Sequence, residues 1–240
     1  MHAALPSYGA AASVLLAPLL TGDASALREA ARTRLAVHYE TELPGLPDVC
    51  VATHTAVRLP HAVVVDTLPG ADLVVERSCL TDGSRRWRVS RWWSPSRPRV
   101  VGALRTPAPD DWMVVEGLDR DAVVSLVVDR LLGGGPGLTP AGDDVLAGAL
   151  VAAWATNDPM ADELRVVTRR RLTPGRTTAV SRGMLTAAWD GYCCPELAAY
   201  IADPVTAERG LLAVGHSSGR ALRAGVWAVL SRRSAREEAA

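Results

Sequence analysis

Residues 133–144 combine the residue types in this chain best suited to hold a small ligand. They read Gly-Gly-Gly-Pro-Gly-Leu-Thr-Pro-Ala-Gly-Asp-Asp, with four glycines and a proline within five residues. Glycine has no side chain to block a ligand and adopts positive φ at little cost. Thr139 and Pro140 predict a helix N-cap followed by a first-turn proline. Asp143 and Asp144 then fall in the first turn, where negative charge suits the helix dipole. We therefore predict a ligand-binding loop that opens onto a helix end.

A simpler interpretation of this stretch is a C-capping glycine, a tight turn and a well-capped helix, with no ligand. Five glycines exceed what a turn requires, since each costs conformational entropy on folding, and this favours a binding loop. The stretch fits neither common nucleotide motif. Asp143 and Asp144 stand where a Walker A loop has Lys and Ser or Thr. Leu138 occupies the third glycine position of a Rossmann fingerprint, and the loop follows a predicted helix rather than a strand.

Two adjacent carboxylates limit what such a loop can bind. They repel a phosphate group unless an arginine or a cation compensates their charge, or they hold Mg²⁺, an amide or an ammonium group instead. For Asp143, helix capping and ligand contact are expected equally, whereas Asp144 is expected at the surface. Apart from Mg²⁺ at this pair, the sequence predicts no metal and no cofactor.

Two further segments share the design of a small or hydroxyl-bearing loop that leads into a helix. They are Arg176-Thr177-Thr178-Ala179-Val180-Ser181 and Gly215-His216-Ser217-Ser218-Gly219-Arg220. Helix N-termini bind anions, although a simple N-cap at Thr177 or Thr178 explains the first segment equally well. His216 is a candidate acid or base, but no second histidine or paired acid lies near it in the sequence. We predict that the three segments converge on one polar pocket that binds a small anionic substrate.

Composition places the chain among globular proteins. Its 240 residues, of which 48% are hydrophobic, suffice for one large domain or two small ones packed together. The formal net charge is zero, so nothing suggests binding to nucleic acid or to an anionic membrane surface. The four cysteines form no CxxC pair and no metal-binding spacing with histidine, which is typical of a reducing cytosol. We expect a cytoplasmic protein.

Hydrophobic periodicity changes along the chain from a period of two to that of a helix. Strands are predicted at 49–59, 62–67, 73–78, 87–93, 99–104 and 112–116, with a hairpin turn at 81–84. Helices are predicted at 24–37, 118–132, 143–156, 160–172, 177–191, 195–203 and 218–232, and residues 10–20 are read as a first helix or an apolar strap. The expected fold class is α+β, with an antiparallel β-rich N-terminal half packed on a mostly helical C-terminal half. The halves are placed at 1–117 and 118–240, within one compact unit.

The three loop segments together resemble the AllH family. The resemblance lies in Gly-Pro-Gly-Leu-Thr-Pro-x-Gly-Asp-Asp at 135–144, Thr-Thr-x-x-Ser at 177–181 and Gly-His-Ser-Ser-Gly at 215–219. It extends from about residue 131 to residue 229. The residues that match the family motifs are Gly135, Gly137, Thr139, Gly142, Asp143, Asp144, Thr177, Thr178, Ser181, Ser217, Ser218 and Gly219. Arg176 and Arg220 depart from the family pattern.

The resemblance implies a subunit of an oxamate carbamoyltransferase that acts with partner subunits in allantoin-linked, purine nitrogen catabolism. Carbamoyl transfer passes through a tetrahedral oxyanion, which needs preorganised N–H donors and a cation more than a strong base. Glycine-loop amides and Arg176 or Arg220 are the expected donors, and no residue is assigned as catalytic. Two alternatives stay open: a non-catalytic assembly or regulatory subunit, and a small-molecule-binding protein without turnover. Self-association is also open.

Overall fold

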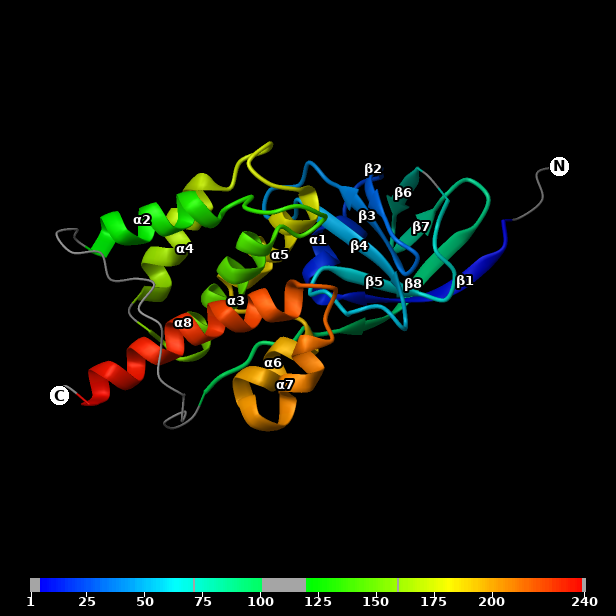
Figure 1. The fold of residues 1–240 in the computed structure, drawn as a ribbon. Helices are drawn as coiled ribbons and strands as arrows, with labels where there is room; N and C mark the ends of the chain where they lie inside the picture. Colours follow the sequence, from blue (N-terminus) through cyan, green and yellow to red (C-terminus); the bar gives the residue numbers. More distant parts are fainter. Residues whose placement is uncertain (1–4, 71, 101–119, 159, 239–240) are drawn as a thin grey trace.

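In the computed structural model, the chain consists of a β-barrel followed by a group of helices (Figure 1). The structure describes residues 5–70, 72–100, 120–158 and 160–238. The strands are β1 (Ser7–Ser13), β2 (Ser25–Arg32), β3 (Ala36–Glu40), β4 (Asp48–Thr53), β5 (Ala62–Val65), β6 (Leu73–Glu76), β7 (Cys79–Thr81) and β8 (Arg86–Trp93). The helices are η1 (Val14–Leu16), α1 (Ala17–Thr21), α2 (Arg120–Leu131), α3 (Ala141–Ala155), α4 (Met160–Arg171), α5 (Ala179–Trp189), α6 (Pro195–Ala202), α7 (Pro204–Leu212) and α8 (Ser218–Glu238).

The strands close into a barrel in the order β1-β5-β4-β3-β2-β6-β7-β8. β4 pairs with β5 in parallel, and β1 closes the barrel by pairing in parallel with β8. The other neighbouring strands are antiparallel. The expectation of an antiparallel β-rich layer packed on helices is therefore wrong, although strands do precede helices along the chain. Barrel closure is a pairing of the first strand with the last, which no local pattern in the sequence reveals.

The barrel interior is filled by alternating side chains, as in other small barrels. On β3, Val37 and Tyr39 are fully buried inside, together with Trp87 of β8. Ala36 and His38 alternate with them and therefore belong to the outer face. The apolar segment at 10–20 is neither one helix nor a simple strap. It contains β1, η1 and α1, and leucines of η1 and α1 join the barrel core.

The outer face of β3 and β4 is buried as well. A small apolar cluster there consists of Ala36, Cys50, Ala52 and Ala62. Helix α5 packs against β3 and β4, and Arg182 of α5 forms an ion pair of 2.5 Å with Glu40. Burial on both faces explains why β3 and β4 are buried along nearly their whole length instead of alternating.

Helix α3 lies at the centre of the helical half, and α8 runs along it (Figure 1). Most residues of α3 after Ala141 are buried, as expected for a helix whose sequence is apolar on nearly every face. The close approach needs glycine. A Cβ at Gly148 would lie 2.1 Å from the carbonyl oxygen of Leu222, and one at Gly225 would lie 2.0 Å from that of Val145.

Several predicted elements differ from those observed. The predicted helix at 24–37 is wrong: it covers β2 and the start of β3, because strand pairing outweighs the helix propensity of its Ala, Arg and Glu residues. The predicted strand at 49–59 ends at Thr53, where a turn begins. Beyond the helix predicted at 195–203, α7 is a further helix. The predicted strand at 112–116, most of that at 99–104 and the boundary at 117 lie outside the described residues, so the division into two halves at that point stays a prediction.

None of the helices within the described residues combines the length and apolar character that a bilayer crossing requires.

Candidate functional site

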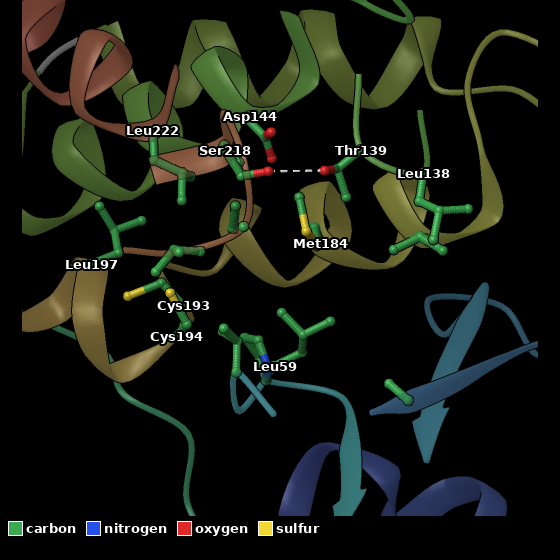
Figure 2. Close-up of a pocket in the computed structure, with 18 of the residues that line it drawn as sticks. Leu59, Leu138, Thr139, Asp144, Met184, Cys193, Cys194, Leu197, Ser218 and Leu222 are labelled. Carbon is green, nitrogen blue, oxygen red and sulfur yellow. Dashed lines mark hydrogen bonds between the residues drawn. The ribbon is translucent and has the colours of Figure 1, made fainter. Parts of the chain in front are cut away.

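A cavity of about 330 Å³ lies between the outer face of the barrel and the helices α3, α5 and α8. The barrel contributes residues of β3 and of the segments on either side of β3 and β4, and the helical half contributes residues of all three loop segments or the helices that follow them. Figure 2 shows Asp144, Thr139 and Ser218 together on one side, with Leu197, Met184 and Leu59 among the apolar side chains on the others. The cavity is thus largely apolar, with a polar group at its helical wall.

The three loop segments meet, as predicted, but the cavity beside them is largely apolar and not the polar pocket that was expected. The hydroxyls of Thr139 and Ser218 are 3.0 Å apart and hydrogen-bonded, which joins the first segment to the third (Figure 2). The Thr178 hydroxyl donates to the carbonyl of Leu138 at 2.6 Å, which joins the second segment to the first. Thr139 does not cap α3: Pro140 occupies the N-cap position, and no side chain caps the helix there.

Asp143 connects loops and does not contact the cavity. Its Oδ1 accepts a hydrogen bond of 2.7 Å from the Gly133 N–H, and its Oδ2 accepts one from the Thr177 hydroxyl. The side chain is fully buried and is absent from the cavity lining. Asp143 is not the N-cap of α3, and its carboxylate instead holds the second segment and the end of α2 against the first turn of α3. Its expected contact with a ligand stays a prediction.

Asp144 is the carboxylate that lines the cavity. It is 1% exposed, so the expectation of a surface position is wrong. Consecutive helix residues point about 100° apart, which sends Asp143 and Asp144 to different surroundings. Burial raises the pKa of Asp144 to about 6, with a small further rise from the Asp143 charge, although the hydroxyls of Ser218 and Thr139 partly counteract it. Among the described residues, neither carboxylate oxygen has a hydrogen-bond partner of good geometry.

The second segment is mainly structural. Thr178 is the N-cap of α5 and accepts from the Ser181 N–H at 3.0 Å, so the simple capping interpretation is correct for this residue. The Ser181 side chain is buried, and its hydroxyl has no partner among the described residues. Arg176 lies at the surface, about half-exposed and 3.7 Å from Asp129. None of these side chains lines the cavity.

The third segment contributes Gly215 and Ser218 to the cavity. His216, Ser217 and Arg220 are exposed. Residues 215–219 have the Gly-x-Ser-x-Gly spacing of a nucleophile elbow, but the segment follows helix α7 and Ser217 lies outside the cavity lining, so the context of that motif is missing. Gly219 serves packing, since a Cβ there would lie 2.0 Å from the Leu211 carbonyl oxygen.

The predicted glycines have local structural roles. Gly135 and Gly137 have φ of +119° and +97°, which favours glycine at both positions. A Cβ at Gly142 would lie 2.0 Å from the carbonyl oxygen of Leu131. Among the described residues, no group of three histidine, cysteine or acidic side chains could hold a metal ion. Mg²⁺ at the aspartate pair remains an untested prediction.

A buried cluster on the barrel wall was not predicted from the sequence. His38 lines the cavity, and its Nδ1 lies 3.1 Å from Oδ2 of the fully buried Asp48. The same oxygen lies 2.9 Å from Nε2 of buried His61. Burial alone lowers the pKa of His38, but Asp48 and the nearby Cys50 raise it to about 10. Burial opposes ionisation of Asp48 too, yet the two histidines hold the pKa of its carboxyl below the usual value.

The sequence contained only a weak signal for this cluster. His38 and Asp48 lie on neighbouring strands, and the register pairs His38 with Cys50 and Glu40 with Asp48, which makes the contact a diagonal one. His61 directly precedes β5, which runs parallel to β4. The register between these strands is set by the barrel as a whole. Period-two patterns can place His38 and Asp48 in strands, but they do not show that the two side chains meet.

No solved structure matches this chain. Residues 131–230 match the model of the family described as oxamate carbamoyltransferase subunit AllH, so the family resemblance predicted from the three loop motifs is confirmed over the helical half that carries them.

Proposed function

We propose that this protein is a subunit of a carbamoyltransferase complex and binds a carbamoyl-bearing small molecule in the cavity between barrel and helices. The Asp144 carboxylate accepts hydrogen bonds from the primary amide of that molecule, and the Thr139 and Ser218 hydroxyls flank it. The observation that carries this function is the buried Asp144 carboxylate, which has no hydrogen-bond partner of good geometry among the described residues, at the place where the three loops meet. The family match covers these loops.

Charge favours an amide over an anion beside Asp144. Leaving a buried acceptor without a donor costs about 1–3 kcal/mol, and more when the acceptor is charged. A ligand N–H removes that cost, whereas a phosphate or carboxylate oxygen at the same place adds repulsion. Oxamate and carbamoyl phosphate share a primary amide, so this contact would recognise both. At neutral pH a group with a pKa of about 6 is mostly ionised and acts as an acceptor.

The chemical step itself is assigned to the assembled complex. An oxyanion needs donors that are already in place, and the Thr139 and Ser218 hydroxyls are the donors this chain offers near Asp144. The description of the matching family as a subunit supports partner chains that complete the site. Allantoin-linked nitrogen catabolism is the setting that the resemblance implies, and the cysteine pattern favours the cytoplasm.

A non-catalytic assembly subunit is the second candidate. Gly142, Gly148 and Gly219 each occupy a position where a Cβ would come within 2.2 Å of a backbone carbonyl oxygen, so much of the glycine content serves helix packing. In that case the family motif describes a scaffold, and the substrate binds to a partner.

Thermal unfolding in the presence of oxamate, carbamoyl phosphate or inorganic phosphate distinguishes the two candidates. A ligand that binds only the folded protein stabilises it by about 2.7 kcal/mol at a hundred times its Kd. We expect oxamate and carbamoyl phosphate to raise the Tm of the wild type and to leave that of Asp144→Asn unchanged. Asp66→Asn, which alters an exposed carboxylate outside the cavity lining, should behave like the wild type. An equal shift in Asp144→Asn refutes the proposed contact, and no shift in the wild type favours the scaffold.

A further inference from the structure

The barrel wall of the cavity carries a group that neither the loop motifs nor the family match includes. The matched region begins at residue 131, whereas His38, Asp48 and His61 all precede it. Building on the proposed function, we propose that His38 is the anion-binding residue of this cavity. Its ligand then carries a carboxylate or phosphate at the end away from the amide that Asp144 holds.

The cluster presents one member to the cavity and encloses the others. His38 is among the lining residues, and Asp48 and His61 are not. Asp48 Oδ2 lies between the two imidazoles, 3.1 Å from His38 Nδ1 and 2.9 Å from His61 Nε2. Gly183 of α5 seals the other side, since a Cβ there would lie 2.8 Å from Asp48 Cβ and 3.0 Å from His61 Nε2. The cavity is therefore the open side of the cluster.

Asp48 is a positioning residue for His38. A hydrogen bond at Nδ1 sets the orientation of an imidazole and leaves Nε2 as the nitrogen for a further partner. The Asp48 carboxylate is fully buried, and such a charge is retained only where it is paired. It thus favours the protonated form of His38, whose ring lines the cavity. Burial raises the pKa of the Cys50 thiol across the strand pair, and the hydrogen bond with His38 partly counteracts this rise.

The two walls together define the class of ligand. Among the described lining residues there is no Lys or Arg, and the predicted cations Arg176 and Arg220 lie at the surface. His38 is then the positive group on the barrel wall, and Asp144 is the negative group on the helical wall. A short molecule with an amide at one end and an anionic group at the other, such as oxamate, matches both.

Isothermal titration with oxamate and oxamide tests this assignment, because the two differ only in the replacement of a carboxylate by a neutral amide. We expect the wild type at pH 7.5 to bind oxamate roughly 10- to 100-fold more tightly than oxamide, the factor of one charge-assisted hydrogen bond. His38→Gln should bind oxamate as weakly as oxamide while its affinity for oxamide stays unchanged. His54→Gln, an exposed histidine outside the lining, serves as the control. Carbamoyl phosphate in a parallel titration distinguishes a carboxylate site from a phosphate site.

The same titrations on the wild type over a series of pH values test the role of His38 without relying on a variant that must fold. The imidazolium form binds the anion, so the oxamate-to-oxamide affinity ratio should hold near neutral pH and fall as pH rises towards 10. Cys193 and Cys194 of the lining have thiol pKa values raised by burial, and they stay neutral over this range. Tyr192→Phe removes the phenol that lines the same cavity, and the fall of the ratio with pH should persist in this variant.

The outcomes distinguish this inference from the proposed function. If the wild type binds neither compound, the proposed function fails. If it binds both equally and its ratio does not change with pH, or if His38→Gln keeps the full preference for oxamate, only the role of His38 is refuted.

Discussion

Replacing Asp144 with Asn should stabilise the ligand-free protein at neutral pH, in a manner that depends on pH. Burial raises the pKa of this carboxyl from 3.8 to about 6. A raised pKa means that the folded state binds the proton more tightly than the unfolded chain does. The stability that protonated Asp144 contributes is therefore complete below about pH 4 and is lost as pH rises through 6. The Asp144→Asn protein lacks this dependence, because an amide does not ionise in this range.

The magnitude follows from the same two values. Each pH unit between 3.8 and about 6 is worth about 1.36 kcal/mol, so ionisation of Asp144 costs the folded protein about 3 kcal/mol at pH 7. The free energy of unfolding of Asp144→Asn minus that of the wild type should rise by about this amount from pH 4 to pH 7. Any fixed gain or loss from the asparagine amide is the same at each pH and cancels in the rise.

Urea unfolding followed by circular dichroism at half-unit steps from pH 4 to pH 8 measures the difference directly. Other titrating groups occur in both proteins and cancel to first order. For the control Asp66→Asn, the difference in free energy of unfolding from the wild type should change little with pH, because this carboxylate is exposed. If the Asp144→Asn difference is also flat, Asp144 is not a desolvated carboxylate, and the physical basis for an amide-binding site is lost. Gain of stability together with loss of oxamate binding would identify a site maintained at the expense of stability.

Three further outcomes are expected from unfolding experiments. Asp143→Ala should lower the free energy of unfolding by about 3 kcal/mol, since it removes two hydrogen bonds to a buried charge; a loss below about 1 kcal/mol would contradict its connecting role. Gly148→Ala should lower the free energy of unfolding by about 2 kcal/mol or more, because the added Cβ pushes α8 away. In the control Gly210→Ala, the added Cβ meets nothing within 4 Å, so this change should be neutral or stabilising by up to about 1 kcal/mol. Similar Tm changes in the two variants would argue against the close helix contact. The stability lost in His38→Gln should be largest at pH 4–6.5 and should shrink as pH rises through about 10, because the raised pKa of His38 places its contribution below that value; a pH-independent loss would exclude a charged His38.

Local chemistry was readable from the sequence wherever near neighbours decide the structure. The Asp pair falls in the first turn of α3, Thr178 caps α5, and the run after Ala141 is buried, all as patterns over a few residues indicate. The motifs of the three loops also led to the family that matches residues 131–230. Capping hydrogen bonds and helical periodicity involve residues within about one turn of each other. They can therefore be predicted from a single sequence.

Tertiary structure alone decided which of these residues face the cavity. Asp143 and Asp144 are identical neighbours in the sequence, so local patterns do not distinguish them. Asp143 nevertheless holds loops together and Asp144 lines the cavity, because the two side chains point to different sides of α3. The barrel is closed by parallel pairing of β1 with β8, and its register brings His38 to Asp48. These contacts join segments that are far apart in the chain and form only when the barrel closes. Short-range sequence patterns therefore do not predict them.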